Sequence, residues 1–310
     1  MNRRTFLHIT TGAVAGSLLG LDALADETGR SHPAYPRKRS GLIKEKEDLV
    51  AEINKLIEET CPGKGYDAKQ FFDDQRFRFH RSVVRGVERS DANTERWKKK
   101  IKDKSEEEIF KLHVDSARRY WANIGIAAFI GIGQRFYDEN REFLQQIQST
   151  YKVHANYIAA FLALESKGVD EFGDHDPFNR LASYHFTRRK AELCNTHLPH
   201  LVILSYERGL NPHDIPGSTA GAITGSQMLP KIVRDFFISL SEERKNKPDF
   251  YHPEDCIVST ANYLAPHWDI THDACHPRYN DCPLKKAILA YNKSTKYALT
   301  ITKIAESIKL

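Results

Sequence analysis

A single acidic residue, Glu165, ends a strongly apolar stretch of the chain. The stretch begins at Tyr157 and closes on Gly168, so its spacing predicts a helix that a C-terminal glycine terminates. Apolar surroundings raise the pKa of a carboxyl group because desolvation disfavours the anion. A carboxylic acid that stays protonated near neutral pH can donate its proton to a glycosidic oxygen. Periodicity alone equally fits a surface glutamate at a helix end, so the rest of the chain must decide.

Three segments downstream of this glutamate carry side chains that suit a sugar ligand. Residues 217–230 hold three glycines, which allow a close approach of the backbone to a ligand, together with a hydroxyl and an amide. Residues 259–264 and 290–297 add tyrosine rings, which stack on sugar faces, and an asparagine amide, which bonds acetamido and hydroxyl groups. The candidate binding residues in these segments are Ser218, Gln227, Tyr263, Tyr291, Asn292 and Tyr297.

The N-terminus has the pattern of a secretory signal peptide. Arg3 and Arg4 precede a short apolar stretch, and Ala23 and Ala25 flank a leucine at the expected cleavage position. We therefore expect residues 1–25 to be removed and the mature protein to be periplasmic. The arginine pair is also compatible with a twin-arginine export signal. An uncleaved membrane anchor is the lesser alternative, because the apolar stretch is short for a bilayer.

The five cysteines fit an exported protein, in which disulfides can form. Cys275 and Cys282 enclose a short loop and are the first candidate disulfide pair, and the odd count leaves at least one thiol outside any intramolecular disulfide. His267, His272 and His276 lie beside this pair, but their spacing matches no standard zinc pattern. We expect a disulfide or a plain loop here, with no metal and no cofactor.

The chain is mildly basic, with a formal net charge of +5 over 310 residues. That bias suits an anionic polymer or surface. The chain has no basic stripe interleaved with aromatic residues, so we expect no nucleic-acid partner. A monomer is the expected oligomeric state.

Helical periodicity dominates the chain, and few segments alternate with the period of two that a half-buried strand shows. The glycine-spaced segment 122–133 is expected to pack closely against a neighbouring element, whereas residues 66–105 show no clear pattern. The prediction is a mainly α fold in which residues 26–105 form an N-terminal helical extension. Helices are expected at 41–60, 106–121, 156–166 and 189–208, with another after Asp138 and one final helix that opens at Pro283 and carries Ile301, Ile304 and Ile308.

Six short segments, in this order and at this spacing, resemble the lytic murein transglycosylase B family. The resemblance is strongest over residues 136–308. It includes the helix that ends in an acid, an arginine pair, the glycine loop that leads to a proline, an Ala-Asn-Tyr triplet and a final segment rich in tyrosine. The matching segments are 151–154, 164–166, 188–189, 217–230, 261–263 and 290–297.

The resemblance implies a lysozyme-like catalytic domain over residues 106–310 and a reaction on peptidoglycan glycan strands. Family members cleave the β-1,4 bond between N-acetylmuramic acid and N-acetylglucosamine and leave a 1,6-anhydro end. By carry-over, Glu165 is the catalytic acid and then the base, and Ser218 and Asn292 orient the acetamido or neighbouring groups. The glycan groove would be lined by Gln227, Tyr263, Tyr291 and Tyr297, with Arg188 and Arg189 meeting carboxylates or the peptide stem. Envelope protein complexes are compatible as further partners.

Some positions depart from the family pattern. Ile223 and Thr224 replace the family's Met-Gly, and the usual aromatic residue after the catalytic acid is missing. Segment 241–249 lacks the alternating Asp and Asn ligands of a calcium loop, so we expect no calcium site.

Two alternative functions stay open. A muramidase on the same scaffold would use water as the acceptor, activated by Asp170, Asp174 or Asp176. A catalytically weak murein-binding envelope protein would hold glycan without cleaving it. Anhydro ends, reducing ends or the absence of products separate the three readings.

Overall fold

The computed structural model describes residues 35–36, 39–187, 190–268 and 283–310. Within these residues the regular structure is helical, apart from two isolated β-bridges that join His175 to Gly217 and Ile223 to Met228. The helices are α2 (Arg39–Thr60), α3 (Lys69–Phe72), α4 (Arg81–Ile101), α5 (Glu106–Ile124), α6 (Ile126–Glu139), α7 (Arg141–Tyr151), α8 (Ala155–Ser166), α9 (Pro177–Ser183), α10 (Ala191–Arg208), α11 (Pro230–Phe236), α12 (Pro253–Leu264), α13 (Pro283–Tyr291) and α14 (Thr295–Ala305), with short 3-10 turns at Tyr184–Phe186, Pro212–Asp214 and Ala265–His267.

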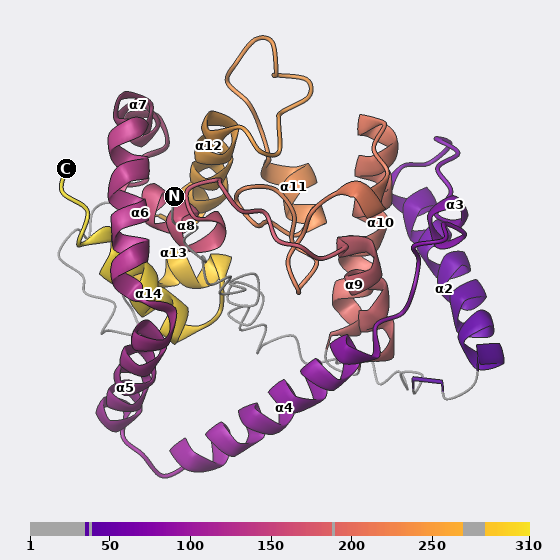
Figure 1. Cartoon of the computed structure of the whole chain (residues 1–310), viewed down its shortest axis with the longest axis horizontal. Coiled ribbons are helices and arrows are strands. Elements are labelled where there is room, and N and C mark those ends of the chain that lie inside the picture. Colours follow the sequence, from indigo (N-terminus) through magenta and orange to yellow (C-terminus); the bar gives the residue numbers. More distant parts are fainter. Residues whose placement is uncertain (1–34, 37–38, 188–189, 269–282) are drawn as a thin grey trace, which may run out of the picture.

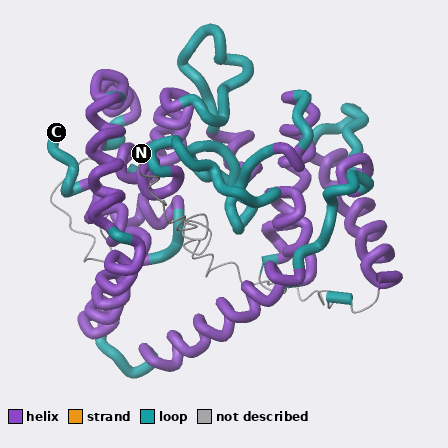
Figure 2. The backbone as a smooth tube through the Cα atoms, viewed as in Figure 1, coloured by secondary structure: helices purple, strands orange, loops and turns teal. Residues whose placement is uncertain are grey.

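The helices form two groups joined by a long bridge (Figures 1 and 2). One group contains α5 to α8 and α12 to α14, and the other contains α2, α3, α9 and α10. Helix α4 runs between the groups, packing on α9 at its start and leading into α5 at its end, while α11 packs on α10. Within the described residues, no helix is both long and apolar enough to span a membrane.

Helix α8 lies at the centre of the first group. All of its residues from Tyr157 to Leu164 are buried, which is expected for a helix that is apolar on every face. It is covered by α6, α7, α12 and α14. The close packing expected of the glycine-spaced segment is found at Gly133 of α6, where a Cβ atom would lie 3.5 Å from the Cβ of Ala163 and 3.2 Å from Ile304. It is not found at Gly125 or Gly131, where a Cβ atom would meet nothing within 4 Å. These surrounding helices bury the apolar part of α8, and the last turn of α8 carries the carboxyl group of Glu165.

The end of the chain differs from the prediction of one final helix. Two helices, α13 and α14, are separated at 292–294. The Ser294 hydroxyl accepts a hydrogen bond from the backbone N–H of Tyr297 and caps the start of α14. The Asn292 side chain accepts a hydrogen bond from the N–H of Ser294, which stabilises the turn. These two local bonds compete with a continuous helix, and the break turns α14 toward α8.

The N-terminal segment is helical, as predicted, and its side chains join the main core. Helix α2 packs on α10, and the core that contains Ile53 also contains Ile301. Phe72 and Phe77 lie edge-on to Phe178 of α9, with ring centroids 4.9 and 6.1 Å away. The segment that showed no clear pattern holds α4, which fully buries only Val83, Val84 and Val87 and is otherwise largely polar. Division of the chain at residue 105 remains a prediction.

Candidate active site

The site is built around Glu165, at the end of α8, and Tyr297, in the first turn of α14. The Tyr297 hydroxyl donates a hydrogen bond of 2.5 Å to Glu165 Oε1. Tyr297 is fully buried and Glu165 is half-buried. The turn after Glu165 holds its helix end in place: Lys167 and Val169 both have left-handed backbone conformations, with φ of 53° and 68°. That conformation is unfavourable for a β-branched valine, so surrounding contacts must impose it.

Further tyrosines pack beside this pair. Tyr291 lies parallel to Tyr297 with ring centroids 6.5 Å apart, and its other neighbours include Phe161 at 5.0 Å and Tyr263 at 5.5 Å. The Tyr291 hydroxyl donates to the carbonyl of Ser226, and the Tyr263 hydroxyl donates to that of Ala290, 3.0 Å away. Because these hydroxyls are held by backbone oxygens, the two residues contribute ring surface and rigidity to the site.

The surroundings of Glu165 change its acidity. Burial is the largest influence and raises the pKa of the carboxyl group from 4.5 to about 7, although the hydrogen bond from Tyr297 acts in the opposite direction. Burial and the charge of Glu165 in turn raise the pKa of Tyr297 and of Tyr291 well above the usual value. Near neutral pH the site therefore holds a carboxyl group that exchanges a proton readily beside phenols that keep theirs.

We expect the Tyr297→Phe variant to shift the pH dependence of any acid-catalysed reaction at this site. The lost hydrogen bond stabilised the anion of Glu165, so its pKa rises further above about 7. The alkaline limb of the rate profile, where the acid loses its proton, then moves to higher pH, and the maximal rate falls about tenfold. Rates measured across pH 5 to 9 test this, with Tyr263→Phe as the matched control. An unmoved alkaline limb in Tyr297→Phe would contradict the assignment.

Two glycines of the loop at 217–230 pack tightly against side chains from other parts of the protein. A Cβ atom on Gly221, where φ is +83°, would lie 2.6 Å from Leu181. One on Gly225 would lie 2.7 Å from the sulfur of Cys256. Real Cβ atoms do not come so near, so these positions require glycine for packing within the protein. The close approach that the sequence suggested for a ligand is occupied by protein atoms at these two glycines.

Ser218, Gln227 and Asn292 are buried, and each makes hydrogen bonds that shape a local turn. The Ser218 hydroxyl accepts from the backbone N–H groups of Ala220, at 3.2 Å, and of Ala222, at 3.1 Å. The Gln227 amide nitrogen donates to the carbonyls of Phe172, at 3.1 Å, and Thr224, at 3.0 Å. Asn292 organises the turn before α14. Their contribution to glycan binding remains a prediction, and the described contacts are structural.

Tyr120, on α5, is a site residue that the sequence did not single out. Its hydroxyl is buried and has no hydrogen-bond partner within the described part of the chain. Burial, followed by the charge of Glu165, raises the pKa of this phenol. The ammonium of Lys296 lies 4.8 Å from the centre of the Tyr120 ring. No motif contains Tyr120, and its only signal in the sequence is its place on the inward stripe of the helix expected at 106–121.

The three aspartates considered as activators of water are engaged elsewhere or exposed. Asp176 caps α9 and bonds His213 Nδ1 at 2.6 Å. Asp170 and Asp174 have side chains that are 71% and 73% exposed. Neither these nor any other carboxylate of the described residues contributes to the pKa shift of Glu165. The described site is thus organised around one carboxyl group.

Several residues predicted from the sequence lie outside the described residues. They are the arginine pair, the candidate disulfide and the signal peptide: Arg188, Arg189, Cys275, Cys282 and residues 1–25. Among the described cysteines, Cys61, Cys194 and Cys256 are free thiols.

Comparisons with known proteins agree with this architecture. The family described as the transglycosylase SLT domain matches residues 72–277. The membrane-bound lytic murein transglycosylase B of Escherichia coli is 24% identical over 136 residues, which cover 44% of this chain and 37% of that protein. The chain therefore aligns with little more than a third of this curated relative.

Solved structures share the fold. The E. coli lytic transglycosylase SLT35, in complex with calcium, gives a TM-score of 0.60 at 17% identity and covers 83% of this chain and 92% of its own. SltB3 from Pseudomonas aeruginosa, in complex with NAG-NAM-pentapeptide, gives a TM-score of 0.59 at 17% identity. This match covers 85% of this chain and 79% of the SltB3 chain. The mainly α, lysozyme-like fold expected from the sequence is confirmed. Because the family match spans most of the chain, the protein belongs to the transglycosylase SLT domain family.

Proposed function

We propose that the protein is a lytic transglycosylase of peptidoglycan. It cleaves the β-1,4 bond between N-acetylmuramic acid and N-acetylglucosamine and leaves a 1,6-anhydro-muramic end. The observation that carries this proposal is the pairing of Glu165 with Tyr297 at the polar end of a buried helix, where the pKa of the carboxyl group is about 7. An acid of that strength can give a proton and take one back at neutral pH.

The reaction needs one carboxyl group in two roles. Tyr297 occupies Oε1 of Glu165, so Oε2 carries the proton and gives it to the departing glycosidic oxygen as the C1–O bond breaks. The resulting carboxylate then takes the proton of the muramic C6 hydroxyl, whose oxygen closes the anhydro ring on C1. The substrate's own acetamido group stabilises the cationic intermediate. The Tyr297 hydrogen bond stabilises Glu165 while it is charged.

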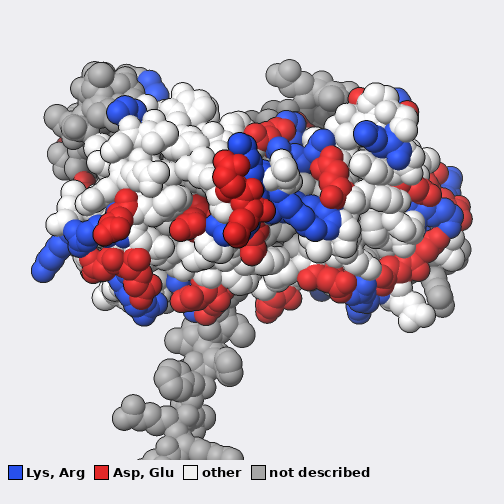
Figure 3. All heavy atoms as spheres, turned by 90° about the horizontal axis from the view of Figure 1, so that it is seen from above, with Lys and Arg blue, Asp and Glu red and all other residues white. Residues whose placement is uncertain are grey.

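A hydrolase of this kind normally uses a second carboxylate to activate water. Asp176 is engaged with His213, and Asp170 and Asp174 are exposed, which favours the transglycosylase over the muramidase. Lys and Arg side chains lie among Asp and Glu on the face of the molecule seen in Figure 3. We expect sugar hydroxyls, acetamido groups and tyrosine rings to supply most of the recognition of the glycan.

Products of digestion test the proposal. Purified murein incubated with the protein is expected to release muropeptides with anhydro ends, each lighter by one water than the product of hydrolysis. Mass spectrometry separates the two. Reducing ends would replace the proposal with a muramidase. Sedimentation of the protein with murein, without any soluble product, would favour the catalytically weak binding protein.

We further infer that the protein works as a monomer in the cell envelope, after export by the predicted signal peptide. The membrane-bound E. coli relative supports the envelope. Peptidoglycan itself lies there, so substrate and enzyme would meet in the periplasm. Envelope protein complexes would then be accessible as partners.

A further inference from the structure

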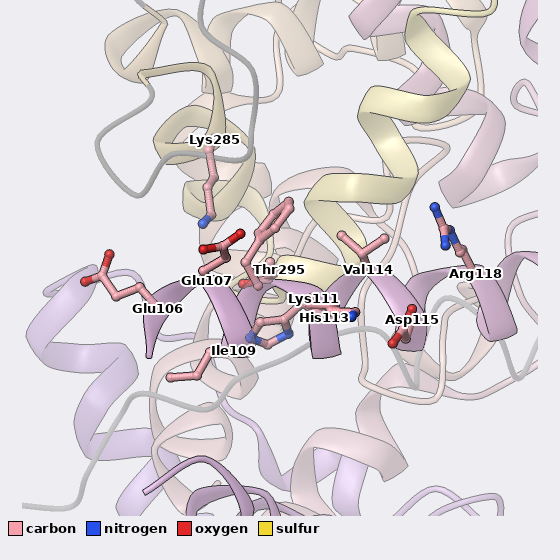
Figure 4. Close-up of a pocket in the computed structure, with 11 residues that line it drawn as sticks. Glu106, Glu107, Ile109, Lys111, His113, Val114, Asp115, Arg118, Lys285 and Thr295 are labelled. Atoms are coloured by element: carbon pink, nitrogen blue, oxygen red, sulfur yellow. The ribbon is translucent and has the colours of Figure 1, made fainter. Parts of the chain in front are cut away.

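A hollow of about 840 Å³ lies along α5, apart from the residues assigned to catalysis. The first turn of α13 and the first residue of α14 form its other side. Figure 4 shows Lys285 extending from α13 toward the first turn of α5, where Glu106 and Glu107 lie, while Arg118 stands at the opposite end. Its volume is in the range of sites that hold small ligands.

The lining of the hollow carries charges of both signs. Lys285 is only 6% exposed, and burial lowers its pKa while nearby Glu106 acts in the opposite direction. Arg118 is exposed at the other end, and Asp115 adds an acid between them. A ligand that matches this lining carries both carboxylates and an amino group, as a short peptide does.

The hollow continues the inward face of α5 from the candidate active site. His113, in the lining, and Tyr120, beside Glu165, are seven residues apart and so lie on one face of the helix, about 10 Å apart along its axis. Thr295, also in the lining, directly precedes Lys296, whose ammonium covers the Tyr120 ring. Part of the lining of the hollow and Tyr120 therefore lie on the same face of α5.

The length of the hollow also fits a peptide. From Arg118 to Glu106 the helix advances twelve residues, or about 18 Å. An extended peptide of five residues spans about 17 Å.

We propose that this hollow binds the peptide stem carried by the muramic residue of the glycan strand, with the Arg118 end nearest the sugar. The inference rests on the proposed function and adds a site for the non-sugar part of the substrate. Arg118 faces the carboxylates near the sugar, Lys285 faces a carboxylate further along, and the acids of the first turn of α5 face a free amino group.

A comparison of two substrates tests the site. Glycan strands that carry peptide stems are compared with strands from which an amidase has removed the stems, and kcat/KM is measured on both. We expect the wild type to prefer the peptide-bearing strands. Lys285→Met should lower that preference about tenfold and leave cleavage of the peptide-free strands unchanged, because one charged contact to the peptide is lost. Lys286→Met, its exposed neighbour, is the matched control and should keep the wild-type preference.

Other outcomes overturn the inference. Equal losses on both substrates in Lys285→Met would assign this lysine a structural role. Arg118→Gln then decides, since an exposed side chain is altered without disturbing the core, and an unchanged preference in this variant as well would remove the peptide site. A wild type that cleaves both strands equally also excludes it. Failure of the wild type to cleave either strand would instead refute the proposed function on which the inference rests.

Discussion

Replacing Glu165 by glutamine is expected to lower the rate of glycan cleavage by at least about 10³-fold. The amide keeps the size of the side chain and can still accept the hydrogen bond of Tyr297, but it gives no proton to a leaving oxygen. Release of anhydro products, followed by mass spectrometry, measures the loss. Glu171→Gln is the matched control, because Glu171 lies six residues further on and pairs with Lys167 on the surface. Activity within tenfold of the wild type in Glu165→Gln would refute the assignment.

Although Glu165→Gln is expected to lose activity, we expect this variant to gain stability at alkaline pH. The pKa of Glu165 in the folded protein, about 7, lies above its ordinary value of 4.5, so the folded state binds this proton more tightly than the unfolded state. The stabilisation that results is fully present below about pH 4.5 and is lost as the pH rises through about 7. Glutamine carries no such dependence. Thermal unfolding should therefore find Glu165→Gln close to the wild type at pH 5 and more stable than it at pH 8. Equal stability at both values would mean that burial does not perturb this carboxyl group.

Replacing Phe178 by alanine is expected to lower the free energy of unfolding by about 3–5 kcal/mol. Phe178 is fully buried in α9, and its ring contacts Phe72 and Phe77 from the N-terminal segment and His213 at 4.9 Å. The change leaves a cavity that rings fixed on three separate segments cannot fill. Urea-induced unfolding measures the loss.

Phe178→Leu serves as the control for this prediction, since it keeps most of the volume and should cost less than about 2 kcal/mol. A further comparison concerns the role of the N-terminal segment. If residues 69–79 are a separate unit, Phe178→Ala would loosen only their docking, and unfolding would occur in two steps. We expect a single step, because these aromatic rings belong to the same core as α8 and α14.

The central helix and its acid were predictable from the sequence, whereas their partners were predictable only in part. An apolar run that ends in one carboxylate fixes both the burial of α8 and the place of Glu165. Tyr297 was identified through the resemblance, but its bond to Glu165 depends on the break at 292–294, where polar side chains outcompete the helix. Tyr120 was missed because long-range packing alone brings its hydroxyl to the site.

Two other features lay beyond sequence reasoning for physical reasons. Helix α4 has few apolar residues: Val83, Val84 and Val87 are buried at its start, and a long polar stretch separates them from Trp97 and Ile101, which made the helix hard to recognise in the sequence. The glycines of the loop at 217–230 suggested room for a ligand, but the nearest neighbours of Gly221 and Gly225 are protein side chains. A glycine indicates that other atoms come close to the backbone, but only the folded structure shows whether these atoms belong to a ligand or to the protein.

The bond between Glu165 and Tyr297 joins positions 132 residues apart in the chain, so this pair exists only when distant helices have packed together. A contact of such high sequence separation carries a large loop-closure entropy cost, so we expect it to form late in folding. Before that point Glu165 is solvated and ionised at neutral pH, and it cannot act as a proton donor. A chain in which α14 has not yet docked on α8 would therefore lack the proton donor that we propose. The proposed activity would appear only together with this docking.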